Sequence, residues 1–377
     1  MLEMTSAVRD LLPWVEVHAL AAEHGDCIVL SYGDGKDNFR LVVDAGVAGT
    51  AERLRRVLDE SGEAAWELLV VSHIDLDHIQ GTLSFLSDKS IATRFDDIWF
   101  NGRQHLEGGR ESMAVAEGKK LTDLLSREGI SWNKRFGENA VCLAADDSPV
   151  CKTLPLSKAA ITILSPSTMG LADLRRLWDL WEEREKRKAE KPVKAETITA
   201  QQAASDIETL SVASLNIADL ADTKTGTDSS VTNGSSIAFI FEYGGFQILL
   251  GADAHANVLL KSATKLPAET LNLDLFKLPH HGSSANVTKR LALKLPARRY
   301  LLTTDGKRHE THPSDVAIAR ALTARPDAEL LFNYPNEAYD RWASRPRERG
   351  YPFKVRAGEG EEGIRVRLET VPSQGIP

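Results

Sequence analysis

The stretch 68–78, Leu-Leu-Val-Val-Ser-His-Ile-Asp-Leu-Asp-His, decides the fold class of this chain. It begins with four aliphatic residues, a run typical of a strand that is buried on both faces. It ends with two histidines and two aspartates within six residues, namely His73, Asp75, Asp77 and His78. Imidazoles and carboxylates gathered at the end of a strand are what a sheet-based enzyme uses to build a two-metal hydrolytic centre.

The spacing of these four residues predicts two metal positions. His73 and Asp75 are two residues apart, so in an extended loop both side chains point the same way and can face one metal. Asp77 and His78 sit at the start of a predicted helix and turn toward a second position. Taken alone, Asp77 also fits a helix N-cap and His73 an ordinary buried histidine. Four crowded polar side chains without a ligand would be costly to bury, so the group as a whole favours metal binding.

Two later strand ends supply the remaining predicted ligands. The apolar run 248–250 leads to Asp253, and the run 275–278 leads to His280 and His281. We expect Asp253 to lie between the metals and one of the two histidines to complete the second position. A water held between two cations about 3.5–4 Å apart loses a proton near neutral pH, so the expected nucleophile is a metal-bridged hydroxide. For His280 the sequence leaves three roles open: ligand, support for a ligand, or substrate contact.

These residues carry a family resemblance. His73-x-Asp75-x-Asp77-His78 resembles the HxHxDH signature of the metallo-β-lactamase fold, with aspartate in place of the second histidine. The HxDxDH variant is similar to the hydrolase domain of the ComEC/Rec2 competence proteins. Further segments resemble that group in the same order: His24-Gly25-Asp26, Val43-Asp44-Ala45-Gly46, Asn233-Gly234-Ser235-Ser236, Gly251-Ala252-Asp253, Pro279-His280-His281-Gly282-Ser283 and His312-Pro313.

The resemblance implies an α/β (α+β) fold, a four-layer αββα sandwich with metals at one edge of the paired sheets. It places His73 and Asp75 on the first metal, Asp253 as the bridge, and Asp77, His78 and His281 on the second. Many family members add a histidine to the first metal just before the hairpin, where this chain has residues 233–236. An oxygen-rich first position of this kind favours Mn²⁺ or Mg²⁺ more than a three-histidine zinc pocket does.

Other residues are expected to support the chemistry. His280 or His312 would protonate the leaving group or touch a phosphate oxygen, beside the ligand Asp77, although His312 also fits an ordinary loop residue. Asp26 and Asp44 are expected to shape turns and orient ligands. Four residues flanking the predicted site are candidates for substrate binding: Asn233, Ser235, Ser283 and Lys277.

Strands and helices alternate along the chain. The resemblance implies one metallo-β-lactamase-like domain over residues 1–377, with its core in 1–166 and 233–377. Residues 167–232 are expected to form an inserted helical segment and flexible loop, which is a possible binding arm for a protein partner. The pattern predicts strands at 14–20, 27–32, 39–46, 68–71, 97–100, 161–164, 237–241, 246–250, 273–278 and 300–304, helices at 51–61, from 77 and at 314–324, and short strands over 328–369.

Bulk composition narrows the class of protein. A net charge of −8 over 377 residues and a pI near 5.8 argue against a protein wrapped in nucleic acid through its overall charge. Three cysteines form no disulfide framework, which indicates a reducing compartment. No stretch approaches the ~20 apolar residues of a spanning helix. We therefore expect a soluble, cytoplasmic protein with no membrane partner, and a role in DNA uptake does not transfer.

The sequence predicts a metal-dependent hydrolase with two divalent ions, Zn²⁺ or Mn²⁺ with Mg²⁺ possible, most simply a phosphodiesterase or nuclease. Its substrate would be nucleic acid or a small phosphoester. One alternative is a small-molecule phosphoester or lactone hydrolase, because the fold alone does not fix the reaction. Another is a catalytically degenerate metal-binding regulatory protein.

Overall fold

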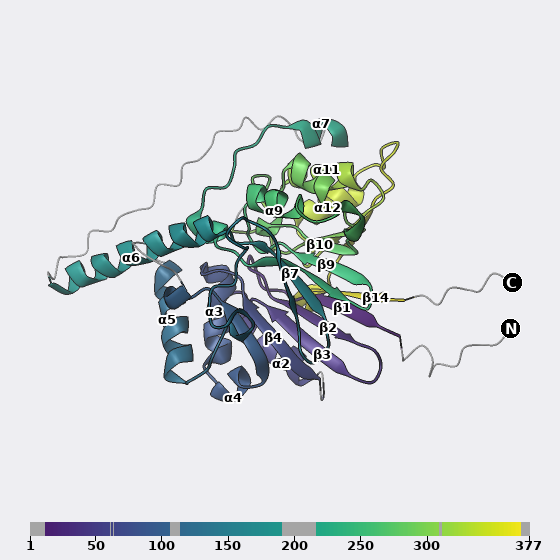
Figure 1. Cartoon of the computed structure of the whole chain (residues 1–377). Coiled ribbons are helices and arrows are strands. Elements are labelled where there is room, and N and C mark those ends of the chain that lie inside the picture. The colour runs from purple at the N-terminus through teal and green to yellow at the C-terminus, as the bar shows by residue number, and fades with distance from the viewer. Residues whose placement is uncertain are drawn as a thin grey trace.

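The computed structural model describes residues 12–60, 62, 64–105, 114–190, 216–308 and 311–370. Within these residues the strands form two sheets that lie face to face, one of six strands and one of eight (Figure 1). The first has the order β14 (Ile364–Glu369), β1 (Trp14–Ala19), β2 (Ile28–Gly33), β3 (Asn38–Val43), β4 (Ala65–Val71) and β5 (Phe95–Phe100). The second has the order β13 (Lys354–Ala357), β12 (Glu329–Phe332), β11 (Arg299–Leu302), β10 (Leu275–Lys277), β9 (Phe246–Leu250), β8 (Ala238–Tyr243), β7 (Ala160–Ser165) and β6 (Val150–Thr153).

Strand β4 contributes apolar side chains to two hydrophobic cores, one on each face of its sheet. Leu68 and Val70 pack between the sheets, against side chains of the second sheet such as Phe239. Leu69 and Val71 point the other way, into the core under the helices of the first sheet. Side chains alternate between the faces of a strand, so a strand covered on both sides needs apolar residues at every position.

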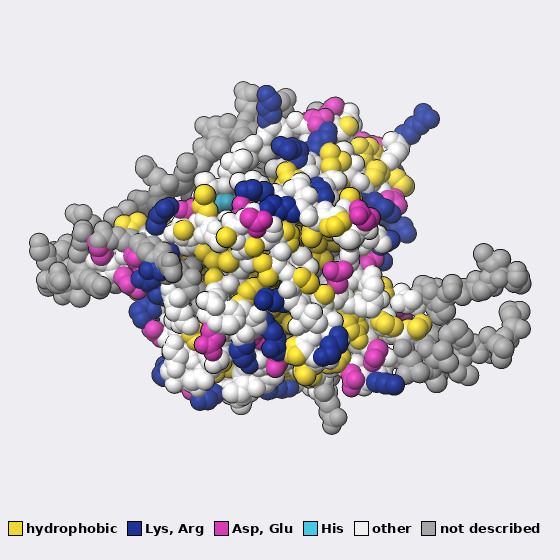
Figure 2. Space-filling view, viewed as in Figure 1, with side chains coloured by type: hydrophobic (Ala, Val, Ile, Leu, Met, Phe, Trp, Pro, Cys, Tyr) yellow, Lys and Arg dark blue, Asp and Glu magenta, His cyan; other side chains and the backbone are white. Residues whose placement is uncertain are grey.

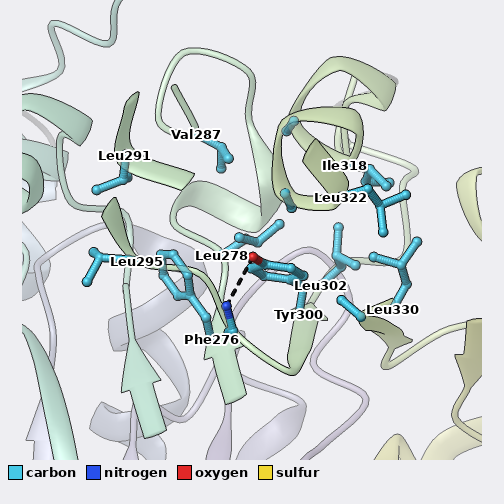
Figure 3. Close-up of a cluster of buried hydrophobic side chains, with 14 of the residues drawn as sticks. Phe276, Leu278, Val287, Leu291, Leu295, Tyr300, Leu302, Ile318, Leu322 and Leu330 are labelled. Atoms are coloured by element: carbon cyan, nitrogen blue, oxygen red, sulfur yellow. Dashed lines mark hydrogen bonds between the residues drawn. The ribbon is translucent and has the colours of Figure 1, made fainter. Parts of the chain in front are cut away.

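Helices cover the outer face of each sheet (Figure 1). The first sheet is covered by α2 (Thr50–Asp59), α3 (Leu76–Leu86), α4 (Lys89–Ala92), α5 (Ala114–Arg127) and the beginning of α6 (Thr168–Glu190). The second is covered by α7 (Ile217–Asp222), α9 (Ala256–Ala263), α10 (Lys289–Lys294), α11 (Asp315–Ala324) and α12 (Glu337–Ser344). Figure 3 shows part of this second helical core, where Phe276 and Tyr300 of the sheet meet Ile318 and Leu322 of α11. The predicted four-layer αββα sandwich is confirmed.

The topology brings the site-bearing loops to one edge. Strands β3, β4 and β5 are parallel, as are β9, β10, β11 and β12, so within each set the carboxyl ends meet. Two backbone hydrogen bonds join the corresponding edges of the sheets: Ile237 N donates to Ser72 O at 2.8 Å, and Asp305 N donates to Glu23 O at 2.8 Å. Loops that follow strands of both sheets therefore converge.

The predicted strands and helices are observed, with small shifts of their ends. The C-terminal tail was predicted as short strands only, and this is wrong for α12, which lies between β12 and β13. Asn336 caps that helix by accepting from Tyr339 N, and Ala338 and Trp342 are its buried residues. Two apolar contacts four residues apart give a weak helical signal, which explains the error.

The predicted inserted segment 167–232 lies partly outside the described residues, at 191–215. Of its described part, α6 packs Leu171, Leu174 and Trp178 into the core of the first sheet, and α7 packs against α11. Its end enters α8 (Val231–Gly234), which leads toward the predicted site. The boundaries of the insertion stay a prediction. Among the helices described here, none combines the length and the apolarity needed to cross a membrane.

We expect Gly81→Ala to destabilise the protein although alanine usually favours helices. Gly81 N donates to Gly46 O at 2.8 Å, and a Cβ at Gly81 would lie 1.8 Å from Ala45 O. Helix α3 would have to move away from the loop after β3, at a cost of about 1–3 kcal/mol in the free energy of unfolding. Urea unfolding measures this. Gly226→Ala is the control, because no atom lies within 4 Å of a Cβ there; equal effects of the two changes would contradict the prediction.

Candidate metal centre

The first cluster of ligands is held by the turn from β4 into α3. His73 lies in the connecting loop, and Asp77 and His78 belong to the first turn of the helix. The N-cap is Asp75, not Asp77, and its side chain makes no capping hydrogen bond. Asp75 Oδ2 instead accepts from Thr232 Oγ1 at 2.9 Å and lies 3.5 Å from His73 Nε2. The N-cap alternative for Asp77 is therefore wrong, and Asp75 keeps its carboxylate for the site.

One carboxylate oxygen stands at the centre of the cluster. Asp253 Oδ2 lies near the Nε2 atoms of four histidines: His78 at 3.6 Å, His281 at 3.7 Å, His280 at 3.8 Å and His73 at 4.0 Å. These distances exceed a hydrogen bond. They suit ligands of shared metal ions, because metal bonds of ~2.0–2.2 Å place two ligand atoms of one ion ~3–4 Å apart.

Three buried histidines each have one ring nitrogen without a hydrogen-bond partner, as a metal ligand would. Within the described part of the chain, the Nε2 atoms of His73, His78 and His281 are buried and make no hydrogen bond. Such orphaned polar atoms are costly and rare. Their other ring nitrogens are held: His78 Nδ1 by Asp44 Oδ2 at 2.8 Å, His281 Nδ1 by Thr303 O at 2.6 Å and His73 Nδ1 by Ser72 Oγ at 3.0 Å. Fixing one ring nitrogen while the other faces a shared point is how proteins orient metal ligands.

The structure brings all six predicted ligands together. Ligand atoms of Asp77, His78 and His281 lie within 4.8 Å of one another, as do those of His73, His78 and Asp253. Asp77 Oδ2 is 3.7 Å from His281 Nε2. Residues from three segments, one after a strand of the first sheet and two after strands of the second, thus form a donor set of imidazoles and carboxylates, and this set fits divalent metal ions.

The electrostatics of the cluster favour positive charge. Burial raises the pKa of Asp253, but the neighbouring imidazoles of His281 and His78 override it and hold that pKa well below its usual value. Burial lowers the pKa of His281, but the carboxylates of Asp253 and Asp26 override it and raise the pKa to about 9. In the same way Asp253 and Asp44 raise the pKa of His78. The carboxylates therefore stay ionised and attract cations.

Asp26 and Lys277 form a buried layer behind the ligands. Asp26 Oδ1 accepts from Thr303 Oγ1 at 2.6 Å, and its carboxylate pairs with Lys277 Nζ. Lys277 is fully buried, donates to Ala252 O at 2.8 Å and lies 3.6 Å from Asp253 Oδ1. Its ammonium group faces the interior between two carboxylates, and the substrate contact predicted for Lys277 stays a prediction that this burial does not favour.

The serines expected to bind substrate are also turned inward. Ser235 is buried, and its Oγ donates to Thr232 O at 2.6 Å, so its predicted substrate contact stays a prediction that this geometry does not favour. Ser283 is buried too, and its Oγ accepts from Ala285 N at 3.3 Å. Its side chain is engaged within its own loop. Both hydroxyls form hydrogen bonds with backbone atoms of their own segments.

The remaining predicted residues lie at the rim. The rings of His280 and His312 have centroids 4.9 Å apart, and 24% of the His280 side chain is exposed. His312 lines a cavity of about 750 Å³. Asn233 Nδ2 donates to Asp228 Oδ2 at 2.7 Å and is 3.4 Å from His280 Nδ1. The catalytic roles of His280 and His312 stay predictions.

Asp228 is a site residue that sequence reasoning missed. Its Oδ2 accepts from Asn233 Nδ2 and from Asn286 Nδ2, and lies 3.5 Å from His280 Nδ1. Burial raises the pKa of Asp228, but His280 and the two amides override it and lower the pKa. Asp228 stands in a Ser/Thr/Asp-rich stretch with no apolar strand before it, so no local pattern marked it.

We expect Asp44→Asn to weaken metal binding without unfolding the protein. Asp44 is buried with φ +57°, a conformation that asparagine tolerates, and its carboxylate holds His78 and both polar groups of Ser72. Loss of its charge makes His78 a poorer ligand, so zinc affinity should fall about 10–100-fold. Competition with a chromophoric chelator measures this. The exposed turn residue Asp34, changed to asparagine, is the control; unchanged affinity in Asp44→Asn would refute the assignment.

Comparisons with known proteins add little beyond this geometry. No family model matches the sequence, and no curated protein matches it. Among solved structures, the chain is similar to the metallo-β-lactamase fold protein YhfI from Bacillus subtilis, with 10% identity and a TM-score of 0.36 over 94% of this chain and 100% of that one. It is also similar to a mutant of the CmlA β-hydroxylase, with 12% identity and a TM-score of 0.37 over 95% of this chain and 54% of that one.

Proposed function

We propose that this chain is a metal-dependent hydrolase that cleaves phosphodiesters, with two divalent ions, Zn²⁺ or Mn²⁺, and Mg²⁺ as a further option. The single observation that carries the proposal is the placement of Asp253 Oδ2 among four imidazole nitrogens at 3.6–4.0 Å. The similarity of the motifs to the ComEC/Rec2 hydrolase domain supports polynucleotides as the phosphodiester.

Each residue then has a defined task. Asp77, His78 and His281 would hold the second metal, and His73 and Asp75 the first, with Asp253 between them. Bound divalent ions would activate a water and stabilise charge on the phosphoryl oxygens. Asp44 and the Thr303 carbonyl keep the rings of His78 and His281 aimed at the centre. His312, which lines the cavity of about 750 Å³, would give a proton to the leaving oxygen.

Two cavities beside the centre provide room for an extended substrate. One, of about 740 Å³, is lined by His24, Arg53 and Arg308 among others, and the other, of about 750 Å³, contains His312. Both are lined by Lys307 and Asp305, so they lie on either side of the same loop. A Cβ at Gly25, the residue after His24, would lie 1.9 Å from Asp77 O, so the loop that lines the first cavity is close to the ligands. Two cavities that share the loop of Asp305 and Lys307 suit a substrate that continues beyond the cleaved bond.

The charge around these cavities favours a short phosphodiester over a long duplex. Their walls carry four basic and five acidic side chains: Arg53, Lys307, Arg308, Arg341, Glu23, Asp305, Glu337, Asp340 and Glu361. The face drawn in Figure 2 likewise shows basic and acidic side chains interspersed. Affinity for long nucleic acids depends on clustered cations. The second candidate function is therefore hydrolysis of a small phosphoester, and lactone hydrolysis is a weaker form of it.

The described part of the predicted arm 167–232 carries exposed apolar side chains. Met169 and Leu180, both on α6, are 73% and 42% exposed. A protein partner on α6 remains part of the proposal.

The test compares substrates and metals on the purified full chain. Protein stripped with a chelator and resupplied with Mn²⁺, Zn²⁺ or Mg²⁺ is assayed on bis-p-nitrophenyl phosphate and on single- and double-stranded DNA and RNA. We expect metal-dependent cleavage that Asp77→Ala abolishes and that Asp34→Ala leaves intact. Cleavage of the small ester alone would select the second candidate. Absence of bound metal after resupply, with melting unchanged by chelator, would refute the hydrolase and favour a regulatory protein.

A further inference from the structure

We propose that His280 is a nitrogen ligand of the first metal position, and that Asp228 holds the His280 ring for this role. The inference rests on the proposed function, since it completes the same metal centre. It starts from a shortage of ligands. The second position has Asp77, His78, His281 and the shared Asp253, a full set for four-coordinate zinc. The first has His73, Asp75 and Asp253 alone, and residues 233–236 beside it include no histidine.

His280 has the same relation to the centre as the other histidines. Its Nε2 lies 3.8 Å from Asp253 Oδ2, inside the 3.6–4.0 Å range of the three buried imidazoles. A histidine placed only to meet a leaving group would not need to share the central carboxylate oxygen. By this distance His280 stands with the ligands, at the edge of the set, since it belongs to none of the groups of three ligand atoms within 4.8 Å of one another in the described residues.

Contacts of α8 place His280 at the first position rather than the second. Thr232 Oγ1 donates to Asp75 Oδ2 at 2.9 Å, and the next residue, Asn233, has its Nδ2 3.4 Å from His280 Nδ1. Adjacent residues of one helical turn thus touch Asp75 and His280. Asp77, by contrast, pairs with His281 on the other side of Asp253. His280 and Asp75 belong to the same half of the centre.

The far side of the His280 ring is held as that of a metal ligand is. Asn286 Oδ1 lies 3.0 Å and Asp228 Oδ2 3.5 Å from His280 Nδ1. With its proton on Nδ1, the ring donates to Asn286 Oδ1, lies beside the Asp228 carboxylate, and keeps the Nε2 lone pair for a cation. Asp228 is itself fixed by the amides of Asn233 and Asn286 and by Ser230 N. The arrangement repeats the contact of Asp44 with His78.

The backbone is bent to present both histidines at once. His280 and His281 have φ values of +48° and +52°, which side-chain-bearing residues rarely adopt. Two adjacent residues in this conformation are maintained only when their surroundings demand it, and such strain gathers at functional sites. Here it brings the Nε2 atoms of consecutive residues to within 3.8 Å and 3.7 Å of one oxygen.

A consequence concerns the choice of metal. With His280 included, each position has two imidazoles and one aspartate of its own and shares Asp253. The sequence-based preference of the first position for Mn²⁺ or Mg²⁺ then disappears, because a second nitrogen makes it equally suited to Zn²⁺.

The experiment counts metals in the full-length protein. Metal-free wild type, His280→Ala, His280→Gln, Asp228→Asn and His312→Ala are saturated with Zn²⁺, desalted and analysed for zinc by mass spectrometry. Affinities come from chelator competition and donor sets from Co²⁺ absorption spectra. We expect two zinc ions in wild type and in His312→Ala, and one in both His280 variants. Asp228→Asn should keep two, with one bound about 10–100-fold more weakly.

The outcomes distinguish His280 as a metal ligand from His280 as a proton donor, and both from failure of the proposed function. Two equally tight ions in either folded His280 variant, with hydrolysis lost, would overturn the inference and make His280 a proton donor, leaving the proposed function intact. Wild type that binds neither zinc nor, on resupply, Mn²⁺ or Mg²⁺ would defeat the proposed function itself. Melting of the metal-free proteins identifies any variant that does not fold. If His280→Ala does not fold, the zinc content of His280→Gln and Asp228→Asn, which keep polar side chains of similar size, tests the inference.

Discussion

Asp253→Asn is expected to remove hydrolytic activity, with a loss of at least about 10³-fold on bis-p-nitrophenyl phosphate, which corresponds to ~4 kcal/mol of transition-state stabilisation. The reason is geometric. Asp253 Oδ2 lies within 4.0 Å of the Nε2 atoms of four histidines, so this one oxygen links both predicted metal positions. Asparagine keeps the shape of the side chain but removes the charge that holds two cations together.

Metal content distinguishes the loss of a shared metal ligand from misfolding of the Asp253→Asn protein. The Asp253→Asn protein should bind at most one zinc ion where wild type binds two, and it should melt as a cooperative unit. Asp59→Asn changes an exposed carboxylate that pairs with Arg94 at 3.4 Å, and it should retain full activity and metal content. Full activity in Asp253→Asn would mean that the centre of the cluster is not the reaction site.

Lys277→Met is expected to cost about 3–5 kcal/mol in the free energy of unfolding of the metal-free protein. The Lys277 ammonium is fully buried between Asp26 and Asp253. Methionine fills a similar volume but leaves two buried carboxylates without their cation. Burial raises the pKa of Asp26, and Lys277 is the main influence that holds this pKa low in the native protein. The destabilisation should therefore shrink as the pH falls and the carboxylates take up protons.

Urea unfolding near neutral pH and under acid conditions measures both parts of this prediction. Lys289→Met is the matched control, because Lys289 pairs with Asp222 at the surface and should contribute less than about 1 kcal/mol. Saturating zinc should reduce the loss in Lys277→Met, since a cation near Asp253 partly replaces the missing charge. A loss as small as that of the control would show that Lys277 is not the counter-ion of the buried carboxylates.

The strands and the metal-ligand candidates were accessible from the sequence for a physical reason. A strand such as β4 is apolar on both faces, so the polar residues that follow it, His73 to His78, stand out. The same contrast marks Asp253 after β9 and His281 after β10. The layer order came from the resemblance of the motifs to the metallo-β-lactamase fold, not from the pattern of strands and helices.

Residues whose role depends on distant partners were not accessible in this way. Lys277 ends a strand and reads as an ordinary surface cation; its burial follows only from the placement of Asp26 and Asp253 on other loops. Asp228 acts through Asn233 and Asn286, which are 5 and 58 residues further along the chain. Helix α12 was missed because only two of its residues are buried.

Both halves of the chain contribute candidate ligands to the donor set. Four candidate ligands precede residue 79 and the other three follow residue 252. A polypeptide divided between residues 190 and 216 would leave neither fragment with a complete chelating group. The proposed hydrolysis would then return only when the fragments reassociate, so its rate would report the reassembly of two sheets to which both fragments contribute strands.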